Sequence, residues 1–314
     1  MPATRLALGA CALLLTAGLW GSNHVVARAI HEMVPLPALV FWRWAIALTI
    51  LTPAAWWEIK RYREPLLRQS WDIAIGGTIG VGVFSYLLIG GAYQSLALEV
   101  GIINATTPVW VAILAWVYGQ SRTGWEGWIG LLLALVGTVT ILAKGSASTL
   151  GALDIRLGNL WSLLGAIAFA WFSLRVRTWS REIGPLSLTA ATAWAGLIGV
   201  MLPVYLISLL FGGPLLVHEG SDLPYALSAT AYVALGPTLL GNVGYLYGVS
   251  ALGPERAAAF IYLSPIFSAI LSVIWLGETL QSFHFAGFSM IFSGLLLVND
   301  DQRRVAQVRS GANK

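Results

Sequence analysis

Apolar runs long enough to cross a lipid bilayer follow one another along almost the whole chain, and this feature most constrains its fold. A helix needs about 20 mostly apolar residues to span the hydrocarbon core. We therefore expect ten membrane-spanning helices, at 6–27, 36–57, 73–95, 100–119, 126–143, 157–175, 186–211, 225–249, 256–276 and 281–299. The connections are too short for a domain outside the membrane. The chain is therefore predicted to be an all-α integral membrane protein.

The composition supports this fold class. Of the 314 residues, 57% are hydrophobic and 10% are charged, whereas soluble domains carry about 25% charged residues. The chain also contains 34 glycines and 15 tryptophans. Glycine suits close helix packing in lipid, and tryptophan suits the membrane–water interfaces. A soluble protein of this composition would expose a large apolar surface to water, so that class is excluded.

Basic residues indicate how the chain is oriented, because cytoplasmic loops carry an excess of Lys and Arg. With the N-terminus inside, three basic residues (Arg28, Lys144 and Arg156) lie on the outer side and Arg43 lies within a span. The cytoplasmic side then holds Arg5, Lys60, Arg61, Arg63, Arg68, Arg122, Arg175, Arg177, Arg181, Arg256, Arg303, Arg304, Arg309 and Lys314. We therefore expect a multi-pass protein of the cell (bacterial inner) membrane, with both termini and the tail 300–314 in the cytoplasm. The net charge of +4 reflects this topology, and no nucleic-acid partner is expected.

An internal repeat divides the chain into two halves. At offsets of 150 to 157 residues, Trp20 matches Trp171, Trp44 matches Trp194, Pro108 matches Pro265, Gly130 matches Gly287 and Gly137 matches Gly294. Because each unit crosses the membrane five times, an odd number, the second copy must enter the membrane with the opposite orientation. Inverted repeats are typical of secondary transporters, whose substrate site lies near mid-membrane between the repeats. We expect the first five-helix repeat in residues 1–145 and the second, inverted repeat in residues 155–299.

Short motifs at matching places carry a family resemblance. They are Trp20-Gly21-Ser22-Asn23, Phe41-Trp42-Arg43-Trp44-Ala45, Pro265, and Trp275-Leu276-Gly277-Glu278-Thr279 followed by Gly287 and Gly294. Over about residues 8–299 the chain resembles the drug/metabolite transporter superfamily in its ten-span EamA-type branch, and within it the bacterial aromatic amino-acid exporters. The resemblance implies ten helices around a central cavity and export of small metabolites by alternating access. The first copy has Gly119-Gln120-Ser121 where the second has Leu276-Gly277-Glu278, so a role tied to that glutamate is in doubt for the first half.

Candidate substrate-binding residues are the polar and aromatic residues inside the spans, because polar groups at lipid depth are costly and mark function. We expect the cavity to be lined by Trp20, Asn23, Phe84, Asn104, Thr107, Trp171, Asn242, Tyr245, Tyr262 and Ser264. Trp20 and Trp171 are interpreted as aromatic walls for a planar substrate, with interfacial anchoring as the alternative. Pro108 and Pro265 are expected hinges, since proline loosens the preceding turn; a kink without function is the alternative.

Charged residues in the spans are few. Arg43 either binds a substrate carboxylate through its guanidinium or has a structural role at backbone carbonyls. His24, next to Asn23, is interpreted as a gate or surface residue, and His284 as interfacial. Every one of the 14 carboxylates maps near a span end or in a loop. Their absence from mid-membrane favours a facilitator, with proton coupling through a group such as His24 left open.

These features predict a membrane transporter that exports small amphipathic metabolites. Aromatic or other hydrophobic amino acids are the leading hypothesis for its substrate. The alternatives are a nucleotide-sugar, sugar-phosphate or drug carrier of the same superfamily. Phosphates would need several basic residues facing the cavity, and only Arg43 is available. An intramembrane enzyme is a different class, but the sequence has no HExxH or GxSxG motif. We expect no catalytic residue, cofactor or metal, and the expected partners are a small-molecule substrate and the lipid bilayer.

Overall fold

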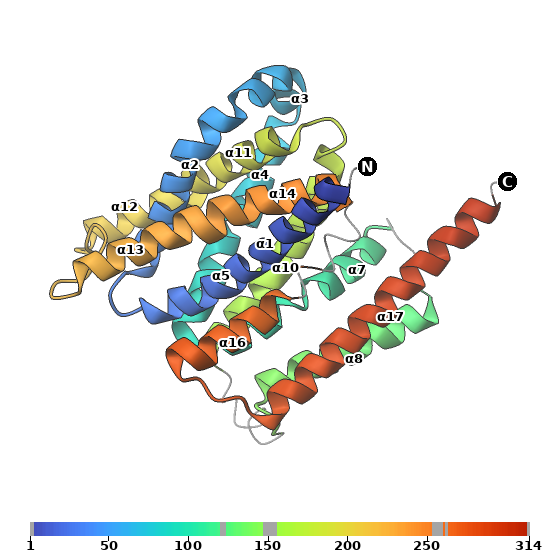
Figure 1. Cartoon of the computed structure of the whole chain (residues 1–314). Coiled ribbons are helices and arrows are strands. Elements are labelled where there is room, and N and C mark those ends of the chain that lie inside the picture. The colour runs from blue at the N-terminus through green and yellow to red at the C-terminus, as the bar shows by residue number, and fades with distance from the viewer. Residues whose placement is uncertain (1–2, 120–123, 147–155, 253–259, 261–262, 313–314) are drawn as a thin grey trace.

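The computed structural model describes residues 3–119, 124–146, 156–252, 260 and 263–312 (Figure 1). Within these residues the structure is helical and contains no strand. Seven helical segments are long and apolar enough to cross a membrane: Leu6–Ala29, Leu36–Arg61, Ser70–Gln94, Ala97–Val117, Leu157–Trp179, Pro185–Leu210 and Leu223–Gly248. Two shorter apolar helices cover Trp125–Ile141 and Ser264–Leu276. The all-helical membrane fold is confirmed, and the number of ten crossings stays a prediction.

Helical structure is present at the position of each expected span. In chain order the described elements are α1 (Ala3–Ala29), α2 (Leu36–Arg61), α3 (Arg63–Arg68), α4 (Ser70–Gly77), η1 (Thr78–Val83), α5 (Phe84–Gln94), α6 (Ala97–Asn104), α7 (Thr107–Val117), α8 (Trp125–Leu142), α10 (Leu157–Trp179), α11 (Pro185–Gly196), η2 (Leu197–Met201), α12 (Leu202–Leu210), α13 (Leu223–Val233), η3 (Ala234–Leu240), α14 (Gly241–Leu252), α16 (Ser264–Leu276) and α17 (Ser282–Ala312). The three elements labelled η are π-helical.

Two of these helices differ from the expected spans. The segment Ala97–Val117 is broken, because α6 ends at Asn104 and α7 begins at Thr107. Helix α17 continues to Ala312, so the backbone of the expected tail from residue 300 onward extends the last helix instead of leaving it.

The paired prolines lie at helix starts. Pro108 is in the first turn of α7 and Pro265 is in the first turn of α16. A first-turn proline costs little, since its missing N–H has no intrahelical acceptor there. Neither proline lies in the interior of a described α-helix, and both the hinge role and the kink without function stay predictions.

The π-helical segments interrupt three long spans near their middles. Thr78–Val83 lies between α4 and α5, Leu197–Met201 between α11 and α12, and Ala234–Leu240 between α13 and α14. Segments η1 and η3 begin 156 residues apart, close to the offset that relates the two expected repeats. Because π-helical turns in α-helices are frequent at functional sites, these segments direct attention to the middle of the bundle.

Helices α8 and α17 pack side by side along their length (Figure 1). Glycines allow this close approach: a Cβ added at Gly137 would lie 2.6 Å from the carbonyl oxygen of Gly287, and one at Gly294 would collide with the carbonyl oxygen of Gly130. The four residues are those that the sequence pairs across the repeat. The pair is thus held together through the glycines that recur in the sequence.

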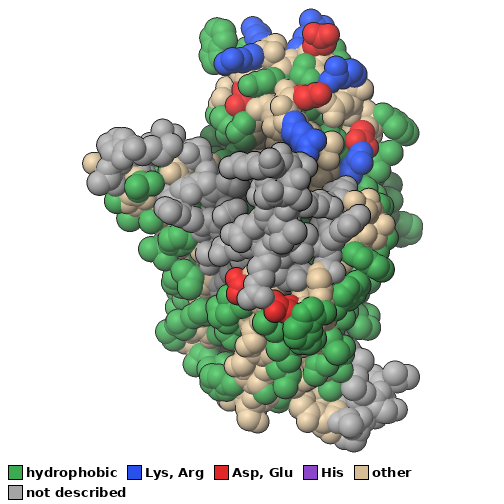
Figure 2. Space-filling view, turned by 90° about the vertical axis from the view of Figure 1, so that its right-hand side faces the viewer, with side chains coloured by type: hydrophobic (Ala, Val, Ile, Leu, Met, Phe, Trp, Pro, Cys, Tyr) green, Lys and Arg blue, Asp and Glu red, His purple; other side chains and the backbone are tan. Residues whose placement is uncertain are grey.

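Charged side chains gather at one end of the molecule. Figure 2 shows Lys, Arg, Asp and Glu side chains crowded at one end of that face and mainly hydrophobic side chains along its flank. Lys60, Arg61, Arg63 and Arg68 lie at the end of α2 and in α3, and we call this end of the bundle the Lys60 end. This distribution suits a helical protein surrounded by lipid.

Candidate substrate site

Three of the expected site residues, which come from different helices, converge on one turn of η3. The indole Nε1 of Trp20 on α1 donates a hydrogen bond to the carbonyl oxygen of Pro237 at 3.1 Å. The Nε of Arg43 on α2 donates to the Thr238 hydroxyl oxygen at 3.0 Å. Asn242 on α14 donates through Nδ2 to the Thr238 carbonyl oxygen at 2.5 Å. We call this arrangement the η3 site.

Local chemistry explains why the η3 turn receives these groups. The Thr238 hydroxyl donates to the Val233 carbonyl oxygen at 2.8 Å, so its oxygen remains an acceptor for the Arg43 Nε–H. Gly241 makes room for the indole, because a Cβ there would lie 2.6 Å from Trp20 Nε1. The ring of Tyr245 lies 5.6 Å from the Trp20 ring. The Trp20 indole, which packs on Tyr245, and the Arg43 guanidinium therefore bond to adjacent residues of one turn.

Four buried side chains of α1, α2 and α13 each contain a polar atom without a hydrogen-bond partner among the described residues. These atoms are Asn23 Oδ1, His24 Nδ1, Arg43 Nη1 and Thr230 Oγ1, and the side chains are between 2% and 6% exposed. The structure thus corrects the interpretation of His24 as a surface residue. Buried polar groups are normally hydrogen-bonded, so each such atom requires an explanation.

The remaining expected site residues lie elsewhere. Phe84 packs on Phe169 at 4.8 Å between ring centroids, and the half-buried Trp171 packs against the hydrophobic core. No ring contact joins Trp171 to Trp20 among the described residues. The arrangement of two aromatic walls therefore stays a prediction.

Two further groups of expected residues lie at helix breaks. At the break between α6 and α7, Asn104 donates to the Val100 carbonyl oxygen at 3.0 Å and Thr107 donates to the Asn104 carbonyl oxygen at 2.7 Å. Ser264 begins α16, where its carbonyl oxygen lies against Gly21. Tyr262 lies outside the described residues. None of these groups shares a hydrogen bond with the η3 site in the described part of the chain.

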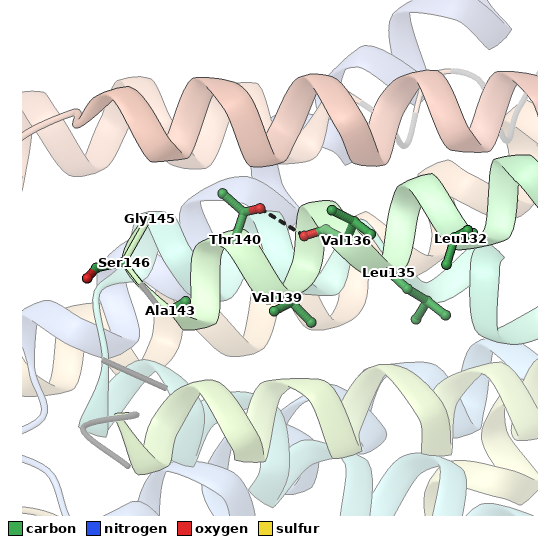
Figure 3. A pocket seen from close by; sticks show the side chains of 8 residues that line it. All are labelled: Leu132, Leu135, Val136, Val139, Thr140, Ala143, Gly145 and Ser146. Carbon is green, nitrogen blue, oxygen red and sulfur yellow. Dashed lines mark hydrogen bonds between the residues drawn. The ribbon is translucent and has the colours of Figure 1, made fainter. Parts of the chain in front are cut away.

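Two apolar cavities lie beside the α8–α17 pair. One, of about 440 Å³, is formed by α6, α16 and α17, with Leu98, Pro265 and Phe285 among its lining residues. The other, of about 480 Å³, runs along α8, and Figure 3 shows Leu135 and Val139 directed into it, away from α17. Apart from Pro265, these cavities contain none of the expected site residues. The central cavity stays a prediction, since Trp20 and Arg43 pack directly against η3 in this conformation.

Glu278 binds one half of the chain to the other, a role that the sequence did not indicate. Its carboxylate accepts hydrogen bonds from the backbone N–H groups of Ala97 at 2.9 Å and Leu98 at 3.0 Å. These groups open helix α6, and a helix N-terminus attracts negative charge. The glutamate of the Leu276-Gly277-Glu278 motif therefore caps a helix of the other half.

Glu99 lies close to this cap, and its side chain is 1% exposed. Its carboxylate accepts hydrogen bonds from Ser95 at 3.0 Å and Asn159 at 2.7 Å. Arg156 lies 3.2 Å from it, and His284 Nε2 lies 3.8 Å away. His284 is 2% exposed and lies in the first turn of α17, so it is buried within the protein, and its position at the membrane interface stays a prediction. We call this end of the bundle, with Glu99 and Glu278, the Glu99 end.

Carboxylates make similar contacts at the Lys60 end. Glu58 on α2 accepts a hydrogen bond from the backbone N–H of Ser187 in the first turn of α11, at 2.6 Å. Asp72 on α4 accepts from Trp179 Nε1 at 2.9 Å and pairs with Arg175, both on α10. Contacts between the two halves of the chain thus occur at both ends of the bundle. Each depends on a carboxylate, so water or loss of the carboxylate charge can break it.

The fold agrees with comparison to known proteins. The model of the EamA-like transporter family matches residues 7–143 and, a second time, residues 156–300. The chain belongs to the EamA-like transporter family. It is therefore a multi-pass membrane transporter rather than an enzyme, and the superfamily resemblance seen in the sequence is confirmed.

Relatives of this EamA-family chain include named transporters. It is 26% identical over 297 residues to the probable terminal-alkyne amino-acid exporter of Streptantibioticus cattleyicolor, covering 94% of each chain. It is 25% identical to the uncharacterized transporter YetK of Bacillus subtilis, over 88% of this chain and 82% of that protein. The uncharacterized inner membrane transporter YedA of Escherichia coli is 23% identical over 89% of this chain and 87% of its own. A protein of known crystal structure with 16% sequence identity superposes on this chain with a TM-score of 0.60. The match covers 97% of this chain and 99% of the other chain, and at this identity it shows that the fold is shared and nothing more.

Proposed function

We propose that this EamA-family transporter exports small amphipathic metabolites, with aromatic and other hydrophobic amino acids as its first substrates. The observation that supports this proposal most is the η3 site, where Trp20, packed on Tyr245, and the buried Arg43 bond to the adjacent residues Pro237 and Thr238. Aromatic rings suit an apolar side chain, and a guanidinium suits a carboxylate. The relative from Streptantibioticus cattleyicolor named as a probable amino-acid exporter supports the choice of substrate class.

Transport by alternating access between two inverted repeats is part of the proposal. It is supported by the two matches of one family model, at 7–143 and 156–300. The packing also supports it: α1 contacts α14 and α16, and α10, its counterpart in the second half, contacts α5, α6 and α7. The glycine contacts between α8 and α17 are symmetric. Exchanging each glycine with its counterpart in the other copy turns the Gly137–Gly287 contact into the Gly294–Gly130 contact. Such exchange is what a two-fold axis in the membrane plane would produce.

The expected orientation and energetics complete the proposal. Both termini lie in the cytoplasm and the Lys60 end faces inward, as the excess of basic residues there indicates. Among the described residues no carboxylate forms an ion pair with Arg43 or bonds to the η3 turn, which supports a facilitative carrier over proton coupling at this site. A single guanidinium disfavours nucleotide sugars and sugar phosphates, since phosphates call for several basic groups.

Counterflow tests this function directly. Purified protein in liposomes preloaded with unlabelled tryptophan is expected to take up labelled tryptophan saturably, without an ion gradient, because a carrier exchanges substrate across the membrane. Trp20→Ala should weaken uptake, while Trp125→Ala should not, since Trp125 is 72% exposed and outside the η3 site. Absence of counterflow with every amino acid offered would contradict the substrate class, and nucleotide sugars and cationic drugs would then be offered.

A further inference from the structure

Most of the buried polar atoms without protein partners belong to helices that pack against η3. Six such atoms occur in the described residues: Asn23 Oδ1, His24 Nδ1, Arg43 Nη1, Arg175 Nε, Thr230 Oγ1 and His284 Nε2. The atoms of Arg175 and His284 belong to side chains that already lie beside a carboxylate, that of Asp72 or Glu99. The other four belong to α1, α2 and α13 and have no such explanation.

The helices that carry these four side chains, α1, α2 and α13, all pack against η3. Arg43 is anchored through Nε on Thr238, while its Nη1 has no partner among the described residues. His24 directly follows Asn23 on α1. Asn23 follows Trp20 by three residues and therefore shares its helix face. Thr230 lies two turns before Thr238 in the same continuous helix, and α13 packs against α2.

The buried charge of Arg43 has no carboxylate counter-charge among the described residues, although its guanidinium carbon lies 6.0 Å from the centroid of the Trp44 ring. Its side chain is 5% exposed, and no Asp or Glu of the described residues forms an ion pair with it. An arginine is almost never fully buried without a partner, and an uncompensated buried charge is strongly unfavourable. A purely structural arginine would use its nitrogens on backbone carbonyls, yet Nη1 has no acceptor.

Donors and acceptors both occur among the four atoms. Arg43 Nη1 and the Thr230 hydroxyl can donate hydrogen bonds, and these suit a carboxylate. Asn23 Oδ1 is an acceptor, and His24 Nδ1 accepts in the neutral tautomer with the proton on Nε2; both suit an ammonium group. A ligand with only one of the two charged groups would leave buried protein atoms unpaired, at a free-energy cost.

We propose that Arg43 and Thr230 bind the carboxylate of a zwitterionic amino acid, and that Asn23 and His24 bind its ammonium group. The Trp20–Tyr245 pair then receives the apolar side chain. This inference rests on the proposed function and deepens it, because it selects zwitterions over organic anions and over cationic drugs. It also assigns Arg43 a substrate role, one of the two that its sequence position left open.

Head-group analogues test the assignment in the wild-type protein. Tryptamine lacks the carboxylate and indole-3-propionate lacks the ammonium group, while both keep the indole ring. In competition with labelled tryptophan during counterflow, each is expected to be at least about 100-fold weaker than tryptophan, because a site built to bond a polar group rejects ligands that lack it. Equal competition by either analogue overturns the assignment while leaving the amino-acid carrier intact, whereas no tryptophan counterflow overturns the proposed function itself.

Variants then assign each group. Arg43→Gln should weaken competition by tryptophan and indole-3-propionate about 10-fold or more but leave tryptamine unchanged, since only the first two have a carboxylate. Asn23→Ala should weaken tryptophan and tryptamine and leave indole-3-propionate unchanged. Equal weakening of all three ligands by Arg43→Gln would show a structural arginine. If a variant fails to fold, judged by size-exclusion chromatography, the wild-type analogue series still decides the proposal.

Discussion

Replacing Glu99 with alanine is expected to lower the unfolding free energy by about 3 kcal/mol, because a buried charge network would lose its central member. The carboxylate is 1% exposed and accepts hydrogen bonds from Ser95 and Asn159, which are themselves buried. Without it, the buried Asn159 amide would lose its acceptor, while Ser95 would keep only the Asn159 side-chain oxygen. The contribution of Arg156 is smaller, since its side chain is 37% exposed and can turn to water.

Unfolding of the purified protein in detergent, followed by circular dichroism as temperature rises, would measure this effect. Glu182→Ala is the matched control: Glu182 pairs with Arg68 at the other end of the bundle, but its side chain is 51% exposed. An exposed pair contributes about 0–1 kcal/mol, so the control should change little. Equal destabilisation by the two substitutions would show that the buried network at Glu99 contributes no more to the unfolding free energy than an exposed ion pair.

Reversing the charge of Glu278 is expected to open the Glu99 end. The Glu278 carboxylate accepts two backbone N–H groups at the start of α6, and a lysine there would place positive charge against a positive helix end. Loss of the cap and the new repulsion together should cost about 2–3 kcal/mol at this contact. Because α6 and the α16–α17 connection belong to different halves, the halves should separate there.

A cysteine at Ser268 reports this opening. Ser268 is fully buried and its hydroxyl donates to the Ala97 carbonyl oxygen at 3.2 Å, so it becomes accessible when α6 and α16 part. In a Cys11→Ser background, which removes the single native cysteine, we expect faster labelling of Ser268→Cys by a membrane-impermeant maleimide when Glu278→Lys is present. Glu278→Gln should give an intermediate rate. An unchanged rate in Glu278→Lys would mean that the cap does not hold this end closed.

The sequence predicted the helical fold well because the bilayer imposes strict rules on it. A spanning helix must be apolar over a known length, so the positions of the helices follow from hydropathy. Close packing in lipid requires small residues, and the recurring Gly130, Gly137, Gly287 and Gly294 do lie at the α8–α17 contact. The break in Ala97–Val117 was not predicted, because Pro108 indicates a disturbance but not whether a helix bends or restarts there.

The candidate site could be predicted only in part. Trp20, Asn242 and Tyr245 were expected to line one site and do meet at η3. Their partner Thr238 was missed, since a threonine in an apolar span has no distinctive sequence signal. Its role depends on the π-helical turn, which brings its hydroxyl to Arg43.

The carboxylate contacts at the ends of the bundle could not be predicted either. Glu99 and Glu278 were recognised only as residues near span ends. Their contacts with Asn159 and Ala97 join segments about 60 and 181 residues apart, and no local pattern encodes such pairing. The same holds for Glu58 and Ser187 at the Lys60 end.

Labelling of a cysteine at Asn242 from each side of the membrane would show whether one site at η3 is reached alternately from both ends of the bundle. In the Cys11→Ser background, Asn242→Cys should react with an impermeant maleimide added to either side of sealed vesicles. Saturating tryptophan should slow both reactions, because the substrate would cover the η3 turn. Labelling from one side only, or labelling that tryptophan leaves unchanged from both sides, would contradict the account.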